Sequence, residues 1–130
     1  MTPAEIHALG DEICDFMEEM YGTLQAGVVY NIFWSLGTGH YIWEPDKYFA
    51  CYWRIQPEDV QNVQDRIKPL DITNGSVMYV AEAASKVGMN VIVKRLREQA
   101  VGMGGVFWHR PAKKDKVYNF PSQQGATHGF

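Results

Sequence analysis

The sequence predicts a single-domain α/β protein in which a mixed β-sheet is flanked by helices. Two patterns indicate this class: apolar residues recur at helical spacing near the N-terminus and near residue 90, and strand-like runs lie between and after them. A length of 130 residues suits one compact domain, so we treat residues 1–130 as a single domain. Apolar residues make up 46% of the chain, which is enough for a packed core and argues against disorder.

The first expected element is a helix near the N-terminus. Thr2-Pro3-Ala4-Glu5 is typical of a capping box with proline at the first helical position. Apolar residues then recur at helical spacing up to Met20, acidic residues occupy mostly the outer face, and Gly22 is a plausible stop. The next stretch, residues 24–36, fits a helix or a strand. We favour a short helix that ends at Gly37-Thr38-Gly39 and leads into a loop or the start of a strand.

The clearest strand is Tyr48–Ile55, in which aromatic and apolar side chains alternate between two faces. A turn at Glu44-Pro45-Asp46-Lys47 precedes it. A polar helix or loop should follow from Pro57 to Lys68. Ser76–Ala81 then predicts a second strand, which its continuous apolar run suggests is fully buried.

Gly88 should open the next helix, whose inner face we expect to contain Met89, Ile92, Val93, Leu96 and Ala100. Gly102–Gly105 resembles a phosphate-binding loop only loosely and is better explained as a turn. Val106–Arg110 and Lys116–Phe120 predict two short strands joined by a basic turn. The expected order is helix, helix, strand, strand, helix, strand, strand, with the later helix crossing over the sheet.

Charge is distributed unevenly along the chain. Residues 1–65 contain eleven acidic and two basic residues, whereas residues 66–130 contain four acidic and ten basic residues. The pI of about 5.7 and the lack of helix-turn-helix, zinc or RNP patterns argue against nucleic-acid binding. The basic second half fits better as a positive surface that binds an acidic protein or a phosphorylated cofactor. The alternative is a charged, solvated surface without a binding function.

Other features predict a cytoplasmic protein without a membrane span. No apolar run reaches the roughly 20 residues that cross a bilayer, and the N-terminus is acidic where a signal peptide would be basic. Cys14 and Cys51 lack metal or redox spacing and should remain buried thiols in a reducing cytosol. The four histidines also lack metal-ligand spacing, so we expect no metal and no tightly bound cofactor.

The strongest candidate site is His40, which lies between Trp34 and Trp43. Histidine exchanges a proton near neutral pH, and apolar walls would exclude water and tune its pKa. The structural alternative is a loop histidine between core aromatics. A second candidate is Glu82, at the C-terminal end of the predicted buried strand, where a carboxylate could orient His40. Its alternative role is a salt bridge with Lys86, four residues on.

These motifs resemble those of the toxin-activating lysine acyltransferases, whose fold is a variant of the Gcn5-related N-acetyltransferase architecture. The resemblance covers roughly residues 28–122 and lies in the Trp34–His40–Trp43 spacing, in strand Tyr48–Ile55, and in Val80-Ala81-Glu82 followed by Gly88. The family has aspartate where this chain has Glu82, and a proline is missing from Ser85-Lys86-Val87. With its short C-terminus, the chain resembles a divergent member, such as one encoded by a phage or prophage.

The resemblance implies transfer of an acyl group from acyl-acyl carrier protein to a protein lysine. It implies His40 as base or nucleophile, Glu82 as its support, and Trp34 and Trp43 as walls of the substrate site. The acidic carrier would dock on basic residues, which are Lys94, Arg95, Arg97, Lys113, Lys114 and Lys116. The alternatives are a coenzyme-A-dependent N-acetyltransferase and a non-catalytic phage protein that retains this fold. The sequence does not identify the acceptor protein, and it is compatible with a homodimer.

Overall fold

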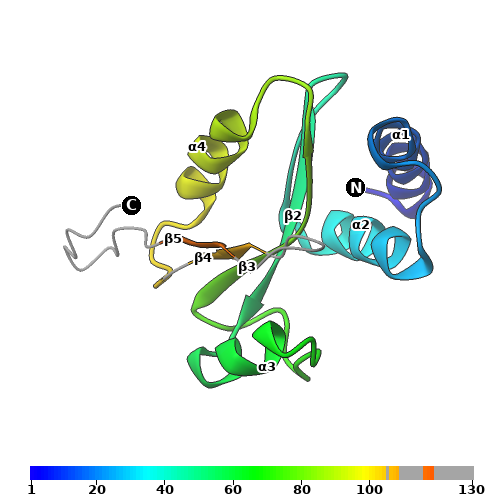
Figure 1. The fold of residues 1–130 in the computed structure, drawn as a ribbon. Coiled ribbons are helices and arrows are strands. Elements are labelled where there is room, and N and C mark those ends of the chain that lie inside the picture. The colour runs from blue at the N-terminus through cyan, green and yellow to red at the C-terminus, as the bar shows by residue number, and fades with distance from the viewer. Residues whose placement is uncertain (105, 109–115, 119–130) are drawn as a thin grey trace. The chain divides into compact units, whose positions relative to one another are not determined.

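The computed structural model describes residues 1–104, 106–108 and 116–118. Its strands form one sheet in the order β1-β2-β3-β4-β5, in which β1 and β2 pair antiparallel, β3 and β4 parallel, and β4 and β5 antiparallel. The expected α/β class with a mixed sheet is therefore confirmed (Figure 1). The elements are α1 (Pro3–Tyr21), α2 (Ala26–Thr38), β1 (Tyr41–Glu44), β2 (Tyr48–Ile55), the 3-10 helix η1 (Pro57–Asp59), α3 (Val60–Gln64), β3 (Val77–Ser85), α4 (Met89–Gln99), β4 (Val106–Trp108) and β5 (Lys116–Tyr118).

The chain forms two compact units. The first contains residues 1–51 and 82–92, and the second contains residues 52–81 together with the described residues from 93 onward. The candidate carboxyl, the candidate histidine and both flanking tryptophans belong to the first unit.

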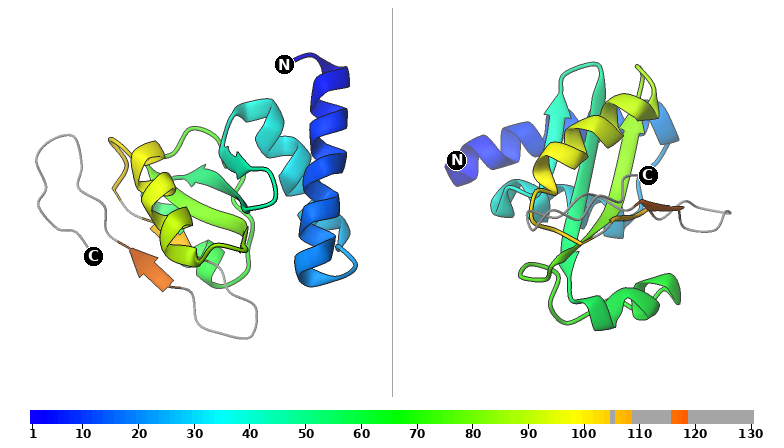
Figure 2. Two further views of the ribbon diagram at one scale, coloured as in Figure 1. Left: turned by 90° about the horizontal axis from the view of Figure 1, so that it is seen from above. Right: turned by 90° about the vertical axis from the view of Figure 1, so that its left-hand side faces the viewer.

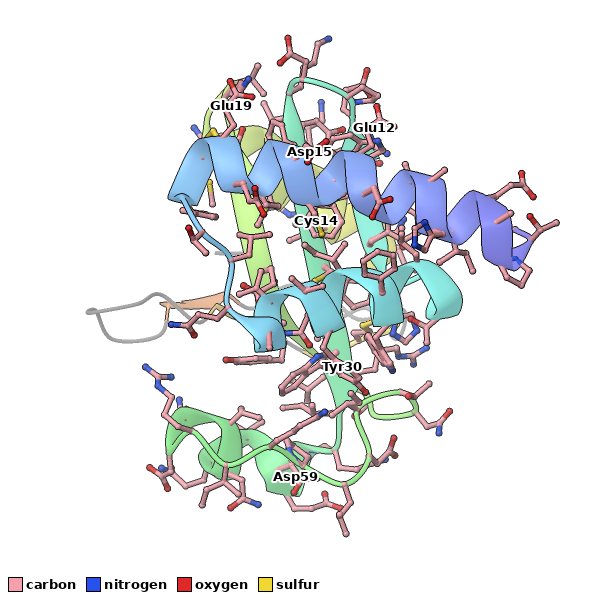
Figure 3. The ribbon with its side chains drawn as sticks, turned by 90° about the vertical axis from the view of Figure 1, so that its right-hand side faces the viewer. Glu12, Cys14, Asp15, Glu19, Tyr30 and Asp59 are labelled. Atoms are coloured by element: carbon pink, nitrogen blue, oxygen red, sulfur yellow. The ribbon has the colours of Figure 1, made fainter. Side chains whose placement is uncertain are left out.

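Helix α1 begins and ends as the sequence predicts. The Thr2 hydroxyl accepts a hydrogen bond from the Glu5 backbone at 3.1 Å, and the Thr2 backbone N–H donates to the Glu5 carboxylate at 2.9 Å. This reciprocal pair is the predicted capping box. The helix ends at Gly22, whose φ of 83° suits glycine. Exposed acidic side chains, among them Glu12 and Asp15, lie along α1 (Figure 3), as expected for an outer face.

Helix α2 confirms the helical interpretation of residues 24–36, although it begins at Ala26 and continues to Thr38. It ends at Gly39, which has a left-handed φ of 81° and donates its N–H to the Ser35 carbonyl. Helices α1 and α2 run side by side (Figure 2). A Cβ atom added at Gly10 would lie 2.2 Å from Cε1 of Phe33, so the absence of a side chain at Gly10 permits this close packing.

Strands β1 and β2 form a hairpin through the predicted turn. The Lys47 N–H donates to the Glu44 carbonyl at 3.0 Å, and Asp46 adopts a φ of 62°, which aspartate tolerates better than most residues. The bounds of β2 are those predicted, whereas the sequence pattern does not define β1 as a separate strand. In the hairpin, Trp43 lies opposite Phe49, and the Trp43 ring also meets the α1 residue Phe16 edge-on.

Strand β3 is longer than its sequence pattern predicts, since it continues past Ala81 to Ser85. Glu82 consequently lies inside the strand and not at its C-terminal end, which corrects the expected position. Strand pairing explains the extension: beyond β3, the Lys86 N–H still donates to the carbonyl of Lys47 at 2.7 Å. Such pairing can override the weak strand preference of Glu and Ala.

The predicted polar segment after β2 is confirmed as η1 followed by the short helix α3. In this second unit, the Arg54 N–H donates to the Ile72 carbonyl, and the Gly75 N–H donates to the Arg54 carbonyl. The ring of Trp53 lies 5.3 Å from the ring of Tyr79. These contacts join the end of β2 to the segment that leads into β3.

Helix α4 begins directly after Gly88 and connects β3 to the parallel strand β4, which confirms the predicted crossover helix. Ile92 and Leu96 are buried as predicted, but Met89 is 42% exposed. The periodic spacing of apolar residues predicts on which face of the helix Met89 lies. It does not predict whether another element covers that end of the face. Residues 101 and 102 form a turn closed by the Met103 N–H, which donates to the Ala100 carbonyl at 2.8 Å, so the predicted turn begins one residue earlier than expected.

Strands β4 and β5 confirm the two C-terminal strands over their described residues. The remaining parts of those predicted strands, 109–110 and 119–120, lie outside the described residues, as do Gly105 and the connecting turn 111–115. Both cysteines are free thiols, and the expected burial is confirmed for Cys51 but wrong for Cys14, which is half-buried on α1. Of the helices in the described part of the chain, none is both long and apolar enough to cross a membrane.

Candidate functional site

The candidate site is centred on the side chain of Glu82 in β3. The Asn31 side-chain amide of α2 donates a hydrogen bond from Nδ2 to Oε2 of Glu82 at 2.9 Å. Burial raises the pKa of the Glu82 carboxyl to about 7, although the Asn31 hydrogen bond acts in the opposite direction. Glu82 can therefore exchange a proton near neutral pH, which an ordinary surface glutamate cannot do.

Helix α2 carries two buried polar side chains toward this site. Asn31 and Ser35 are four residues apart and so lie on one face of the helix. The Ser35 hydroxyl donates to the Ile32 carbonyl at 2.7 Å, which satisfies its proton within the helix. The apolar spacing of α2 predicted a buried face, but it gave no indication that this face contains a polar stripe.

Ser35 also interacts with the buried thiol of Cys51 in β2. Burial raises the pKa of Cys51 well above its ordinary value, and the negative charge of Glu82 raises it further. Hydrogen bonds with the Glu82 backbone and the Ser35 side chain only partly oppose this shift. The thiol therefore stays protonated at neutral pH and is a poor nucleophile.

Helix α1 contributes Tyr21 to the same region. The Tyr21 hydroxyl donates a hydrogen bond to the backbone carbonyl of Ala83. Burial of the hydroxyl raises its pKa, and the charge of Glu82 adds to the shift. Asn31 thus contacts Glu82 directly, Tyr21 and Cys51 lie near it on α1 and β2, and Ser35 contacts Cys51 and not the Glu82 carboxyl. We call these five residues the Glu82 cluster.

The predicted catalytic histidine, His40, is half-buried between α2 and β1. Its ring meets the Trp34 ring edge-on, with 5.4 Å between the ring centroids and 75° between the ring planes. Its backbone N–H donates to the Ser35 carbonyl at 3.2 Å. The structure thus brings His40 and Trp34 together, whereas the ring contacts of Trp43 are with Phe16 and Phe49.

His40 and Glu82 belong to neighbouring parts of the first unit. His40 directly precedes Tyr41, which lies opposite Cys51 in the β1–β2 hairpin, and Cys51 in turn interacts with Glu82. Two strand spacings of about 4.8 Å separate β1 from β3 in this sheet order. The hydrogen bond that the structure gives Glu82 comes from Asn31, so support of His40 by Glu82 stays a prediction.

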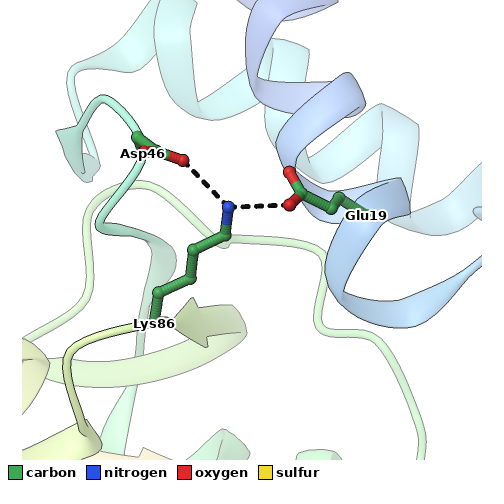
Figure 4. A network of polar contacts seen from close by, with 3 residues as sticks. All are labelled: Glu19, Asp46 and Lys86. Carbon is green, nitrogen blue, oxygen red and sulfur yellow. Dashed lines mark hydrogen bonds and ion pairs between the residues drawn. The ribbon is translucent and has the colours of Figure 1, made fainter.

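Lys86 does not form the salt bridge with Glu82 that was the alternative role for this carboxylate. Its Nζ lies 2.8 Å from the Glu19 carboxylate and 2.9 Å from the Asp46 carboxylate (Figure 4). Residues 82–85 are in a strand, so Glu82 and Lys86 are separated by about 13 Å along the chain. In a helix, residues at this spacing would lie one turn apart on the same face. The i,i+4 pairing that a helix would permit is therefore absent between Glu82 and Lys86.

The basic residues predicted to dock a carrier lie partly on α4. Lys94 and Arg97 are exposed, and half-buried Arg95 pairs with Glu98 at 3.5 Å. Lys113 and Lys114 lie outside the described residues, and for Lys116 only the backbone in β5 is described. The structure thus confirms exposed cations on α4, while their role in docking stays a prediction.

In the part of the chain that the structure describes, no group of three or more His, Cys, Asp or Glu side chains could hold a metal ion. No protein-family model, curated protein or solved structure matches the chain.

Proposed function

We propose that this chain is an acyltransferase that moves an acyl group from a thioester donor to a lysine amine on a protein. The observation that carries the proposal is the Glu82 carboxyl, which lies on β3, accepts a hydrogen bond from Asn31 of α2 and has a pKa of about 7. A lysine amine is protonated at neutral pH and must lose a proton before it can attack. A carboxyl that ionises near pH 7 can supply the negative charge that stabilises a histidine base once it has taken up that proton.

The order of elements supports the same proposal. Parallel strands β3 and β4 are connected by α4, and the hairpin β1–β2 precedes them. This arrangement is compatible with the variant of the Gcn5-related N-acetyltransferase fold that the motifs imply. Glu82 is in β3, the strand in which that resemblance expects a catalytic acid.

In the proposed reaction, the lysine nitrogen attacks the thioester carbonyl carbon. A C–N bond forms, the C–S bond breaks, and the leaving thiolate takes up a proton. His40 accepts the proton from the attacking amine, or first accepts the acyl group itself. Glu82 stabilises the imidazolium form of His40, and Trp34 shields the histidine from water, since the two rings are in contact.

The proposed donor is acyl-acyl carrier protein, an acidic protein that the exposed cations of α4 would attract.

Intact-mass analysis after mixing the protein with acyl-acyl carrier protein and a lysine-containing acceptor tests this function. The native chain should consume the donor or carry an acyl adduct, and His40→Ala and Glu82→Gln should each lose this reaction. His7→Ala is a matched control, because His7 is an exposed histidine on α1 that pairs with Asp11. Reaction with acyl-coenzyme A alone would indicate the acetyltransferase alternative, and no reaction with any donor would indicate a non-catalytic protein.

A further inference from the structure

The contact between Asn31 and Glu82 joins a helix to the strand that holds the candidate acid. Asn31 is only 9% exposed, and an asparagine at such a position needs hydrogen-bond partners. Its amide nitrogen reaches Oε2 of Glu82 at 2.9 Å, a normal length for a hydrogen bond to a carboxylate. A buried amide directed at one carboxylate oxygen restricts the carboxyl group to few orientations.

Two other titratable groups of the described residues lie near Glu82, and both are neutral. Burial and the negative charge of Glu82 raise the pKa values of Tyr21 on α1 and Cys51 on β2 above their ordinary values. Both side chains are therefore neutral near pH 7. The nearby cation Lys86 is directed to Glu19 and Asp46. Among the described residues, the side-chain hydrogen bond to the Glu82 carboxyl comes from a neutral amide.

We propose that Asn31 is a positioning residue. Its side-chain amide holds the Glu82 carboxyl in one orientation through Oε2, so that Oε1 is the oxygen that takes up and releases the carboxyl proton. The catalytic part of this inference depends on the proposed function, whereas the positioning itself does not. The choice of an amide has a physical reason. A cation in the same place would lower the pKa of the carboxyl by roughly 1–3 units, so that the carboxyl would lose its proton well below neutral pH.

Carbon NMR titration of the Glu82 carboxyl tests the positioning directly. The native protein should titrate with a midpoint near 7. Asn31→Leu keeps the branched shape and the number of heavy atoms of the side chain but removes the donor, so the midpoint should rise by about one unit. Ser35→Ala is the matched control, because Ser35 is a buried polar residue on the same face of α2 that contacts Cys51, and it should leave the midpoint unchanged.

The native protein offers a second measurement if Asn31→Leu fails to fold. The side-chain NH₂ resonances of Asn31 should shift with pH at the same midpoint as the Glu82 carboxyl, because the hydrogen bond changes when the carboxyl takes up a proton. An Asn31 amide that does not respond to this titration would overturn the proposal. An unchanged Glu82 midpoint in a folded Asn31→Leu variant would overturn it as well.

Kinetics separate this inference from the proposed function. If both hold, Asn31→Leu should lower kcat about tenfold with little change in KM, and its pH profile should move with the Glu82 midpoint. Asn31→Gln retains an amide donor and should restore part of the activity. If the midpoint moves but the native chain transfers no acyl group, the proposed function fails while the positioning role of Asn31 stands.

Discussion

Glu82 shows how far the position of one residue can change its chemistry. The sequence presents an ordinary glutamate after an apolar run, and spacing alone predicts a strand end for it. The structure extends β3 past it and brings Asn31 of α2 within 2.9 Å of its carboxyl. The resulting pKa of about 7 comes from burial, which depends on the packing of distant segments. Such packing could not be predicted from the sequence.

Replacement of Glu82 by Gln should change how stability depends on pH. The pKa of Glu82 is about 7 when folded and near its ordinary value of 4.5 when unfolded, so the folded chain binds the proton more tightly. The contribution of this group to stability is therefore full below about pH 4.5 and lost as pH rises through 7. The expected loss is on the order of 3 kcal/mol, because one pKa unit corresponds to about 1.4 kcal/mol.

Chemical denaturation at pH 5 and at pH 8 measures this effect. Glu82→Gln has no proton to lose, so it should show a smaller decrease in the free energy of unfolding between these pH values than the native chain. Glu44→Gln is the control, since Glu44 is a half-buried glutamate of β1 in the same unit. Equal pH dependence in native and Glu82→Gln proteins would contradict the raised pKa.

At the scale of elements, local signals predicted α1, β2 and the start of α4 well. The capping box at Thr2, the alternation in Tyr48–Ile55 and the glycine at position 88 each depend on a few neighbouring residues. β1 was missed because four residues are too few for a clear period, and it exists because β2 pairs with it. The polar stripe of α2 was missed because its apolar residues dominate the pattern.

Gly10 tests the packing of α1 against α2. Alanine normally stabilises a helix relative to glycine by up to about 1 kcal/mol. At position 10, however, the new Cβ would lie 2.2 Å from Cε1 of Phe33, so Gly10→Ala should destabilise the chain by roughly 1–3 kcal/mol. Gly27→Ala in α2 meets nothing within 4 Å and should be neutral or stabilising. Thermal unfolding of both variants compares them, and equal melting temperatures would contradict this packing.

Lys86 joins the end of α1 to the β1–β2 turn through Glu19 and Asp46, and its Nζ also lies 5.5 Å from the centre of the Phe16 ring. These pairs are largely exposed, so Lys86→Met should lower the free energy of unfolding only slightly, and less at high salt. Lys47→Met is a control at an exposed lysine in the same turn. Urea denaturation at low and high salt measures the difference. A loss that does not depend on salt would argue against an ionic origin.

At the scale of the whole molecule, charge is divided between an acidic first half and a basic second half. This asymmetry follows from the sequence alone, and the structure adds that Lys94 and Arg97 are exposed on α4. Residues that are far apart in sequence form the Glu82 cluster, and its members were not predicted together because no local pattern connects them. Residue types therefore identified His40 and Glu82 as candidates, while only the fold identified Asn31.

Reversal of two charges on α4 tests the proposed docking of the carrier. The double substitution Lys94→Glu and Arg97→Glu should weaken binding of acyl-acyl carrier protein at least tenfold at low salt, and the difference should shrink as salt increases. Isothermal titration calorimetry measures both effects. Lys47→Glu, an exposed charge reversal in the β1–β2 turn, is the comparison, and equal weakening by both variants would argue against a specific docking face on α4.

The pH dependence of donor consumption tests the central claim most directly. Thioester loss from acyl-acyl carrier protein would be followed from pH 5.5 to 8.5 for the native chain, His40→Ala and Glu82→Gln. We expect the native rate to rise through a midpoint near 7, where the Glu82 carboxyl loses its proton, and both variants to lose most of the rate. A native rate no greater than that of the two variants at every pH would contradict an acyltransferase that uses His40 and Glu82.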